Sequence, residues 1–170
     1  MTLLETQIRP ESTALLVVDM QNDFCAQDGY LQRERGYDVS FAPALAERIQ
    51  GLIDAARKAG AVARGFVGAT AKRWDKPDNA GPVTEADLAV NDLLLSELRG
   101  ARPHYGWLSE ETEDNTDRLG HERVFIIDPI DGTRSFVEGS DTWAHSLAVT
   151  DAGEVTAAVV YLPMRDMLYA

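Results

Sequence analysis

Two kinds of hydrophobic pattern alternate along the chain and predict helices and strands. Apolar residues recur at helical spacing over residues 41–60 and again over residues 84–100, which predicts two long amphipathic helices. Ser40 and Thr84 are candidates for the N-caps of these helices, because their side chains can accept from free main-chain N–H groups. Gly60 is expected to end the first helix, since glycine readily adopts the conformation found just after a helix.

Short and strongly apolar runs predict the strands. Residues 13–18 and 124–127 are continuous apolar or β-branched runs typical of buried strands, and residues 105–109 predict a shorter one. Three further runs within residues 143–170 are joined by turn residues, which predicts an antiparallel meander. Residues 72–82 are rich in Pro, Gly, Asn and Asp and are expected to form a loop. The fold class is therefore α/β (α+β), with layered helices against a largely antiparallel sheet.

Composition and charge restrict the partners of this protein. Its 170 residues are enough for one domain with a core. The net charge of −12 argues against a nucleic acid polymer or an anionic membrane as partner, and means that a site for phosphate would need cations. The single cysteine, Cys25, allows no internal disulfide and suits a reducing cytosol, so we expect a cytoplasmic protein. No apolar run approaches the length of a membrane span, and no signal peptide pattern is seen in the first residues.

One pair of acids follows the apolar run 124–127. Asp128 and Asp131 lie on either side of Pro129, which fixes its own φ and keeps Asp128 extended. The chain must then turn, and Gly132 and Thr133 predict the entry to a short helix. This arrangement would bring two carboxylates and a main-chain carbonyl together, which are the oxygen ligands that Mg²⁺ prefers. The main-chain N–H groups at the helix entry would face an anion such as phosphate.

A second pair of acids, Glu110 and Glu111, follows the short strand at residues 105–109. If this strand and the run 124–127 are neighbours in the sheet, four carboxylates converge. Four such charges would repel one another strongly unless a metal ion lay between them. The alternative is that both pairs belong to ordinary acidic surface turns, and spacing alone leaves both interpretations open.

The motifs around these acids resemble those of a known family. "GWLSEET" and "IIDPIDGTRSF" resemble two segments of the inositol monophosphatase-like, magnesium-dependent, lithium-sensitive phosphatases. The upstream "KPDNAGPVTEADLAVN" is also similar, with Lys76 and Asp87 at the positions of the family's lysine and of the aspartate in its Thr-x-x-Asp element. The resemblance runs over about residues 45–170 and looks most like the 3'(2'),5'-bisphosphate nucleotidase branch. It implies the first domain of the inositol monophosphatase-like sugar phosphatase fold.

The resemblance also implies a set of metal ligands. Glu110, Asp128 and the carbonyl oxygen of Ile130 would hold one Mg²⁺. Asp128 and Asp131 would help to hold a second. Two such ions suit an in-line displacement at phosphorus, in which charge develops on both the attacking and the leaving oxygen.

Further residues receive catalytic roles by the same resemblance. Thr133, paired with Asp87 and assisted by Glu110, would orient the attacking water. The main-chain N–H groups of Gly132 and Thr133 would receive the phosphate. The implied activity is magnesium-dependent hydrolysis of a phosphate monoester of a small phosphorylated metabolite, either a 3'(2'),5'-bisphosphate nucleotide or an inositol phosphate.

In that family a second domain follows the point that Ala170 occupies here, so we expect a truncated and incomplete site with impaired turnover. An uncovered sheet face would favour association of the chain with itself as a homo-oligomer. The rival hypothesis is a non-catalytic fragment that binds metal or self-associates without hydrolysing an ester.

The first part of the chain resembles a different family. "ALLVVDMQNDFC" is similar to the first strand of the isochorismatase-like cysteine hydrolases, and Asp19 matches the aspartate of their catalytic triad. Because no cysteine follows Cys25, the thiol that such chemistry needs is missing, and we expect Asp19 to be an ordinary strand-end carboxylate. We therefore expect a chimera, with an isochorismatase-like strand-loop segment at 1–44 and a phosphatase-like domain at 45–170.

The remaining polar and aromatic candidates are expected mainly in the core or at the surface. His104, His121 and His145 share no spacing typical of metal ligands and are expected at the surface or in the core. Trp143 is expected to fill the core. For Arg134, contact with phosphate and a place on a helix surface both stay open.

Overall fold

The computed structural model describes residues 25–67, 71–76 and 81–170, which fall into two compact units, 1–42 and 43–170. The first unit contains helix α3 (Tyr30–Arg35), which ends at Gly36 in the left-handed conformation. The strand expected at residues 13–18 lies outside the described residues. The expected division of the chain at residue 44 stays a prediction.

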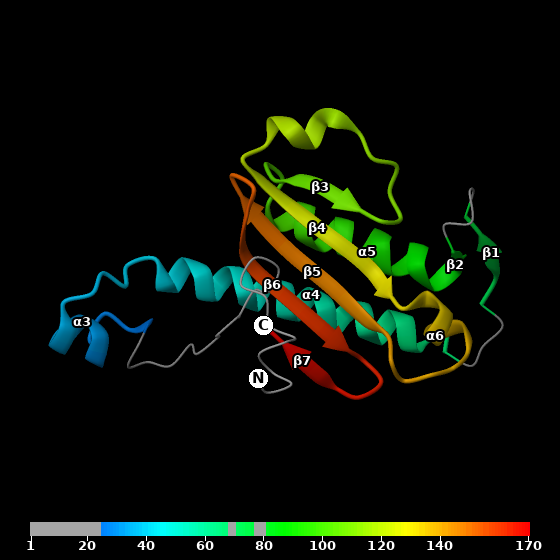
Figure 1. Cartoon of the computed structure of the whole chain (residues 1–170), viewed down its shortest axis with the longest axis horizontal. Helices are drawn as coiled ribbons and strands as arrows, with labels where there is room; N and C mark the ends of the chain where they lie inside the picture. Colours follow the sequence, from blue (N-terminus) through cyan, green and yellow to red (C-terminus); the bar gives the residue numbers. More distant parts are fainter. Residues whose placement is uncertain (1–24, 68–70, 77–80) are drawn as a thin grey trace, which may run out of the picture. The chain divides into compact units, whose positions relative to one another are not determined.

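Two long helices belong to the second unit and lie against one face of its sheet (Figure 1). They are α4 (Ala42–Arg64) and α5 (Glu85–Ala101), close to the expected helical ranges. Each buries an apolar stripe at helical spacing, which in α4 is rich in alanine and therefore lets the helix backbone approach the sheet closely. The buried residues of these stripes include Leu52, Ala55, Ala56, Ala59 and Ala63 in α4 and Ala86, Val90, Leu94 and Leu98 in α5. None of the described helices is both long and apolar enough to cross a membrane.

The sheet has the order β3-β4-β5-β6-β7, so that neighbours in the sheet are also neighbours in sequence. Only the β3–β4 pair is parallel and the other three pairs are antiparallel, which confirms the largely antiparallel sheet. A short 3-10 helix (Thr116–Gly120) lies in the acidic connection between β3 and β4. The strands are β3 (Gly106–Ser109), β4 (Arg123–Asp131), β5 (Ala144–Asp151), β6 (Glu154–Leu162) and β7 (Met167–Tyr169).

Burial alternates along the strands, as expected for a sheet with helices on one face. Phe125 and Ile127 of β4 are buried in the core, whereas Ile126 between them is partly exposed. Trp143, just before β5, is fully buried and edge-on to Phe136, which confirms its expected place in the core. The core of this unit therefore lies between the two helices and one face of the sheet.

The loop expected at residues 72–82 is in part a second, small sheet. Strand β1 (Arg73–Asp75) pairs antiparallel with β2 (Pro82–Thr84), and the N–H of Lys76 donates to the carbonyl of Gly81 at 2.9 Å. Strands of three residues are too short to show a period in the sequence, and Pro and Gly next to them suggested a loop. Gly81 has a φ of 104°, a conformation that favours glycine.

Strand β4 continues beyond the apolar run that predicted it and includes both acids. Asp128 pairs with Ser146 and Asp131 with Ala144, so the two residues between the acids face a single residue of β5, His145. This is the geometry of a β-bulge. The expected short helix follows directly as α6 (Thr133–Val137), after Gly132 with a φ of 92°.

Gly60 does not end the first helix, contrary to expectation, because α4 continues to Arg64. A Cβ atom at this position would lie 2.7 Å from Cε1 of Tyr161 and 3.1 Å from the ring of Pro163. The glycine therefore serves close packing of α4 against the end of β6, and its place in the helix costs some helical propensity.

We predict that Gly60→Ala destabilises the protein by about 1–2 kcal/mol, because overpacking outweighs the gain in helical propensity. Gly51→Ala is the matched control in the same helix, since a Cβ there meets nothing within 4 Å. The control should stabilise by up to about 1 kcal/mol. Urea unfolding of both variants measures the difference, and equal stabilisation by both would contradict the packing role of Gly60.

Candidate functional site

The two pairs of acids come together because β3 and β4 are parallel neighbours. Ser109 pairs with Ile127, and the N–H of Glu110 donates to the carbonyl of Ile127 at 3.2 Å. Glu110 and Asp128 each follow one of these paired residues, so both lie at the same edge of the sheet. The two strands are therefore neighbours, which is the condition under which the sequence predicted that the acids converge.

Asp87 connects the first turn of α5 to this edge. The N-cap Thr84 accepts from the N–H of Asp87, while Oδ2 of Asp87 accepts from the N–H of Thr84 at 2.8 Å, which forms a capping box. The other carboxylate oxygen, Oδ1, accepts from the hydroxyl of Thr133 at 3.1 Å. Burial raises the pKa of Asp87 above its ordinary value, although its hydrogen bonds to Thr84 and Thr133 act in the opposite direction.

The hydroxyl of Thr133 lies between two acceptors. Its Oγ1 is 3.1 Å from Oδ1 of Asp87 and 3.0 Å from the carbonyl oxygen of Ile130. A hydroxyl carries one hydrogen, so it donates to one of the two at a time and keeps its lone pairs available to accept a hydrogen bond. The structure thus places the hydroxyl of Thr133 beside Asp87 and the carbonyl of Ile130, and the catalytic and metal-binding roles of these residues stay predictions.

Lys76 supplies positive charge to the acids. Its Nζ is 2.8 Å from Oε1 of Glu110 and 2.7 Å from Oε1 of Glu111. Burial lowers the pKa of Lys76, but these two partners outweigh burial and the pKa is raised. For Glu111 the balance is reversed, because burial of its side chain raises the pKa more than Lys76 lowers it.

Asp128 is the most strongly perturbed acid of the site. Its pKa is raised from 3.8 to about 7, first by burial and then by the negative charges of Glu110 and Asp131. Its Oδ1 is buried and has no hydrogen-bond partner among the described residues. A buried carboxylate oxygen without a donor, next to further acids, is an environment that a cation would stabilise.

The donors fit a hard divalent cation. Within the described ranges, no three acidic, imidazole or thiol side chains are placed to hold one ion by themselves. The first ligand set implied by the sequence needs only two such side chains, Glu110 and Asp128, because its third ligand is the carbonyl of Ile130. All of these donors are oxygens, as Mg²⁺ and Ca²⁺ require. The metal-binding roles of these residues and of Asp131, which is exposed, stay predictions.

His145 is a contributor to this site that the sequence did not reveal. It is fully buried, and its Nδ1 forms a hydrogen bond with the carbonyl of Pro129, in the bulge between the two acids. Burial lowers its pKa to about 4, with a further contribution from Arg64 and an opposing one from the Pro129 carbonyl. The ring is therefore neutral at neutral pH, and Nδ1 carries the hydrogen because a carbonyl can only accept. His145 thus holds the main chain that carries both acids.

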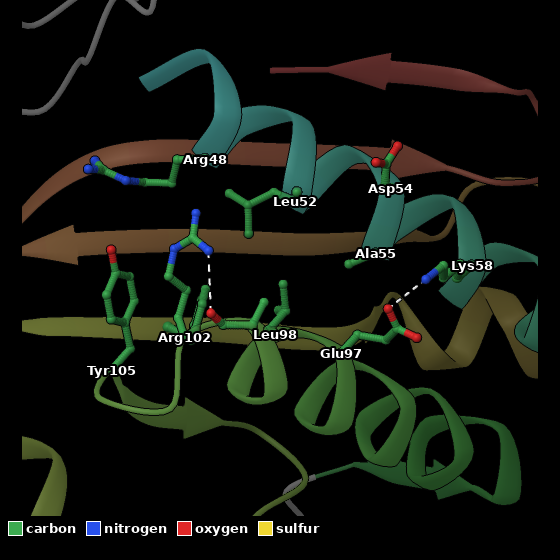
Figure 2. Close-up of a pocket in the computed structure, with 12 residues that line it drawn as sticks. Arg48, Leu52, Asp54, Ala55, Lys58, Glu97, Leu98, Arg102 and Tyr105 are labelled. Carbon is green, nitrogen blue, oxygen red and sulfur yellow. Dashed lines mark hydrogen bonds and ion pairs between the residues drawn. The ribbon is translucent and has the colours of Figure 1, made fainter. Parts of the chain in front are cut away.

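A separate pocket of about 220 Å³ lies between α4, α5 and the sheet (Figure 2). Leu52, Leu98 and Tyr105 are among its apolar lining residues. Its charged side chains already have partners: Lys58 binds Glu97, Arg102 binds Glu47, and Asp54 accepts from Gln50. The acids at the end of β3 and β4 are therefore the stronger candidate for chemistry.

The model of the inositol monophosphatase family matches residues 44–170. An inositol-1-monophosphatase from Rhizobium meliloti is 41% identical over 87 residues, which is 51% of this chain and 32% of that protein. A 3'-phosphoadenosine 5'-phosphate phosphatase from Mycobacterium bovis is 42% identical over 98 residues, which is 54% of this chain and 36% of that protein. Residues 1–43 lie outside the family match.

Solved structures agree with these matches. The structure of the Thermotoga maritima IMPase has a TM-score of 0.65 and 31% identity to this chain, and the match covers 72% of this chain and 46% of that one. The fold expected from the sequence is thereby confirmed. The chain spans about a third of the length of the two curated relatives named above and just under half of this structure.

The raised pKa of Asp128 predicts a pH dependence of stability. The carboxyl of Asp128 loses its proton near pH 3.8 in the unfolded chain and near pH 7 in the folded chain. The folded state therefore gains stability from holding this proton, in full below pH 3.8, and loses this stability as the pH rises to about 7. In metal-free buffer, Asp128→Asn should remove this loss. We therefore expect the melting temperature of Asp128→Asn minus that of the parent to increase between pH 4 and pH 7. A difference that does not change with pH would show that Asp128 titrates normally.

The environment of His145 predicts a neutral ring with the hydrogen on Nδ1. In ¹⁵N-edited NMR spectra, the ring should keep this tautomer as the pH falls through 6.5 and should become protonated only near pH 4. His145→Asn provides a comparison, since the amide of Asn can still donate to the Pro129 carbonyl. Titration of His145 near pH 6.5, or a hydrogen on Nε2 alone, would contradict the hydrogen bond to the bulge.

Proposed function

We propose that this chain, which belongs to the inositol monophosphatase family, takes part in the magnesium-dependent hydrolysis of phosphate monoesters of small metabolites. The observation that carries this proposal is Asp128, whose buried oxygen has no donor among the described residues and whose pKa is raised by burial and by neighbouring acids. The family match supports it, and the relatives named above are phosphatases of inositol phosphate and of 3'-phosphoadenosine 5'-phosphate.

In this proposal Glu110, Asp128 and the carbonyl of Ile130 bind one Mg²⁺, and Asp128 and Asp131 contribute to a second. When bound, magnesium supplies the positive charge that an in-line displacement at phosphorus needs. Lys76 already offsets part of the negative charge, through its contacts with Glu110 and Glu111. These ligands keep their position because the bulge of β4 and the end of β3 are part of one sheet.

Thr133 and Asp87 have the task of orienting the attacking water. When the hydroxyl of Thr133 donates to Asp87, its oxygen can accept a hydrogen bond from a water molecule and so fix the direction of the water's lone pair. Asp87 is held by the N-cap of α5, which gives it a defined position. Glu110 assists as a further acceptor for the same water.

The phosphate group is received by main-chain N–H groups at the start of α6, those of Gly132 and Thr133. The positive φ of Gly132 turns the chain sharply between the last acid of β4 and the helix. A side chain at this position would also approach the carbonyl of Thr142, to which a Cβ would be only 3.3 Å distant. Glycine therefore combines the turn with a small volume beside the proposed phosphate position.

Two substrate classes fit this proposal, bisphosphate nucleotides and inositol phosphates. Both are small and anionic, which suits a site where cations compensate the acids. A cytoplasmic location and assembly into a homo-oligomer belong to the same set of hypotheses. The rival hypothesis, a non-catalytic fragment that binds metal or self-associates, predicts metal binding or self-association without turnover.

The chimeric origin of residues 1–44 remains a separate hypothesis. Asp19, the match to the isochorismatase-like triad, lies outside the described residues, and Cys25 is half-buried. Since the sequence has no second cysteine, we do not propose thiol chemistry for this chain.

The test is release of inorganic phosphate from 3'-phosphoadenosine 5'-phosphate and from inositol 1-phosphate, with Mg²⁺ and with EDTA. We predict turnover only with Mg²⁺, and a loss of about 100-fold or more in kcat for Asp87→Asn, because Thr133 then loses its carboxylate acceptor. Asp92→Asn is the matched control, an exposed acid of the same helix, and should keep the parent rate.

Equal turnover in EDTA would contradict the role of the metal. Metal binding without any turnover would favour the non-catalytic hypothesis. Equal loss in Asp87→Asn and Asp92→Asn would show that Asp87 has no special task.

A further inference from the structure

Two arginines near the site have no partner in the described part of the chain. The sequence has 28 acidic and 16 basic residues, so acids are plentiful. Most described basic side chains accordingly form an ion pair or a hydrogen bond. Three described arginines are exceptions: Arg57, Arg73 and Arg134. Their side chains form no hydrogen bond, ion pair or ring contact with a described residue.

Arg73 and Arg134 line the same groove. This groove has a volume of about 370 Å³ and is open to solvent, and the other described residues that line it are Asp75, Gly81 and Pro82. The arginines come from β1 and α6, two elements distant in sequence. Among the described residues that line the groove, Asp75 is the one acid, so the two arginines give these residues an excess of positive charge although the whole chain is strongly acidic.

Two residues that line the groove are direct neighbours in sequence of residues in the proposed active site. Asp75 directly precedes Lys76, which contacts Glu110 and Glu111. Arg134 directly follows Thr133, whose hydroxyl contacts Asp87. A small molecule held by its phosphate at the start of α6 could therefore reach into the groove with another part.

We propose that this groove binds a second phosphate group of the substrate, with Arg73 and Arg134 as the residues that determine this specificity. This inference rests on the proposed function. A guanidinium group presents parallel N–H donors that match two oxygens of a phosphate, so two such groups favour a ligand with a second phosphate over one with a single phosphate. Asp75 limits the affinity, because its negative charge opposes that of the ligand.

The test compares two ligands that differ by one phosphate. Adenosine 3',5'-bisphosphate and adenosine 3'-monophosphate are titrated by calorimetry into the full chain with Ca²⁺ in place of Mg²⁺, so that the Mg²⁺-dependent turnover proposed above does not contribute heat. Arg73→Gln and Arg134→Gln should each weaken binding of the bisphosphate about fivefold and leave the monophosphate unchanged, as expected for an ion pair at a solvent-exposed position. Asp75→Asn should tighten binding of the bisphosphate.

Arg57→Gln is the matched control, since Arg57 also lacks a partner among the described residues but does not line the groove. It should change neither affinity. Equal affinity of the parent for the two nucleotides, or equal losses in Arg57→Gln and the groove variants, would overturn the inference while leaving the proposed function intact. If the parent binds neither nucleotide with metal present, the inference fails; the proposed function fails with it only if inositol 1-phosphate also releases no phosphate with Mg²⁺.

Discussion

The site depends on the β-bulge at Pro129 and Ile130. Two side chains three residues apart on a regular strand point to opposite faces, so Asp128 and Asp131 could not serve one site without an extra residue between them. Proline has no N–H to donate to the sheet, which makes this position suitable for an interruption of the ladder. The carbonyl of Pro129 is in turn held by the buried ring of His145. The placement of the acids is thus a property of the main chain, fixed from the neighbouring strand.

The arrangement of acids that the proposed metal site needs also destabilises the folded protein. Asp128 lies close enough to Glu110 and Asp131 for their charges to raise its pKa to about 7, together with burial. Lys76 offsets part of this repulsion through Glu110 and Glu111, but the buried oxygen of Asp128 receives no donor from the described residues. A bound cation would relieve the remaining repulsion, so metal binding and stability are expected to be coupled.

Local patterns in the sequence predicted much of this structure. The helix that begins after Thr84, the short helix after Gly132 and the antiparallel meander follow from capping, turn residues and periodicity. Three features could not be predicted, because each depends on contacts with residues distant in sequence. Gly60 is needed for the approach of Tyr161, the strands β1 and β2 are too short to show a period, and the contact of His145 with Pro129 exists only in the paired bulge.

Direct measurement of metal binding tests the central claim most sharply. Mn²⁺ is titrated into the full chain, and the free ion is followed by electron paramagnetic resonance, for the parent, for Asp128→Asn and for Asp92→Asn as a control of equal charge change. We expect binding by the parent and by Asp92→Asn, and loss of binding in Asp128→Asn. If the three proteins bind equal amounts of Mn²⁺, or the parent binds none, the acids gathered by the bulge do not form a metal site.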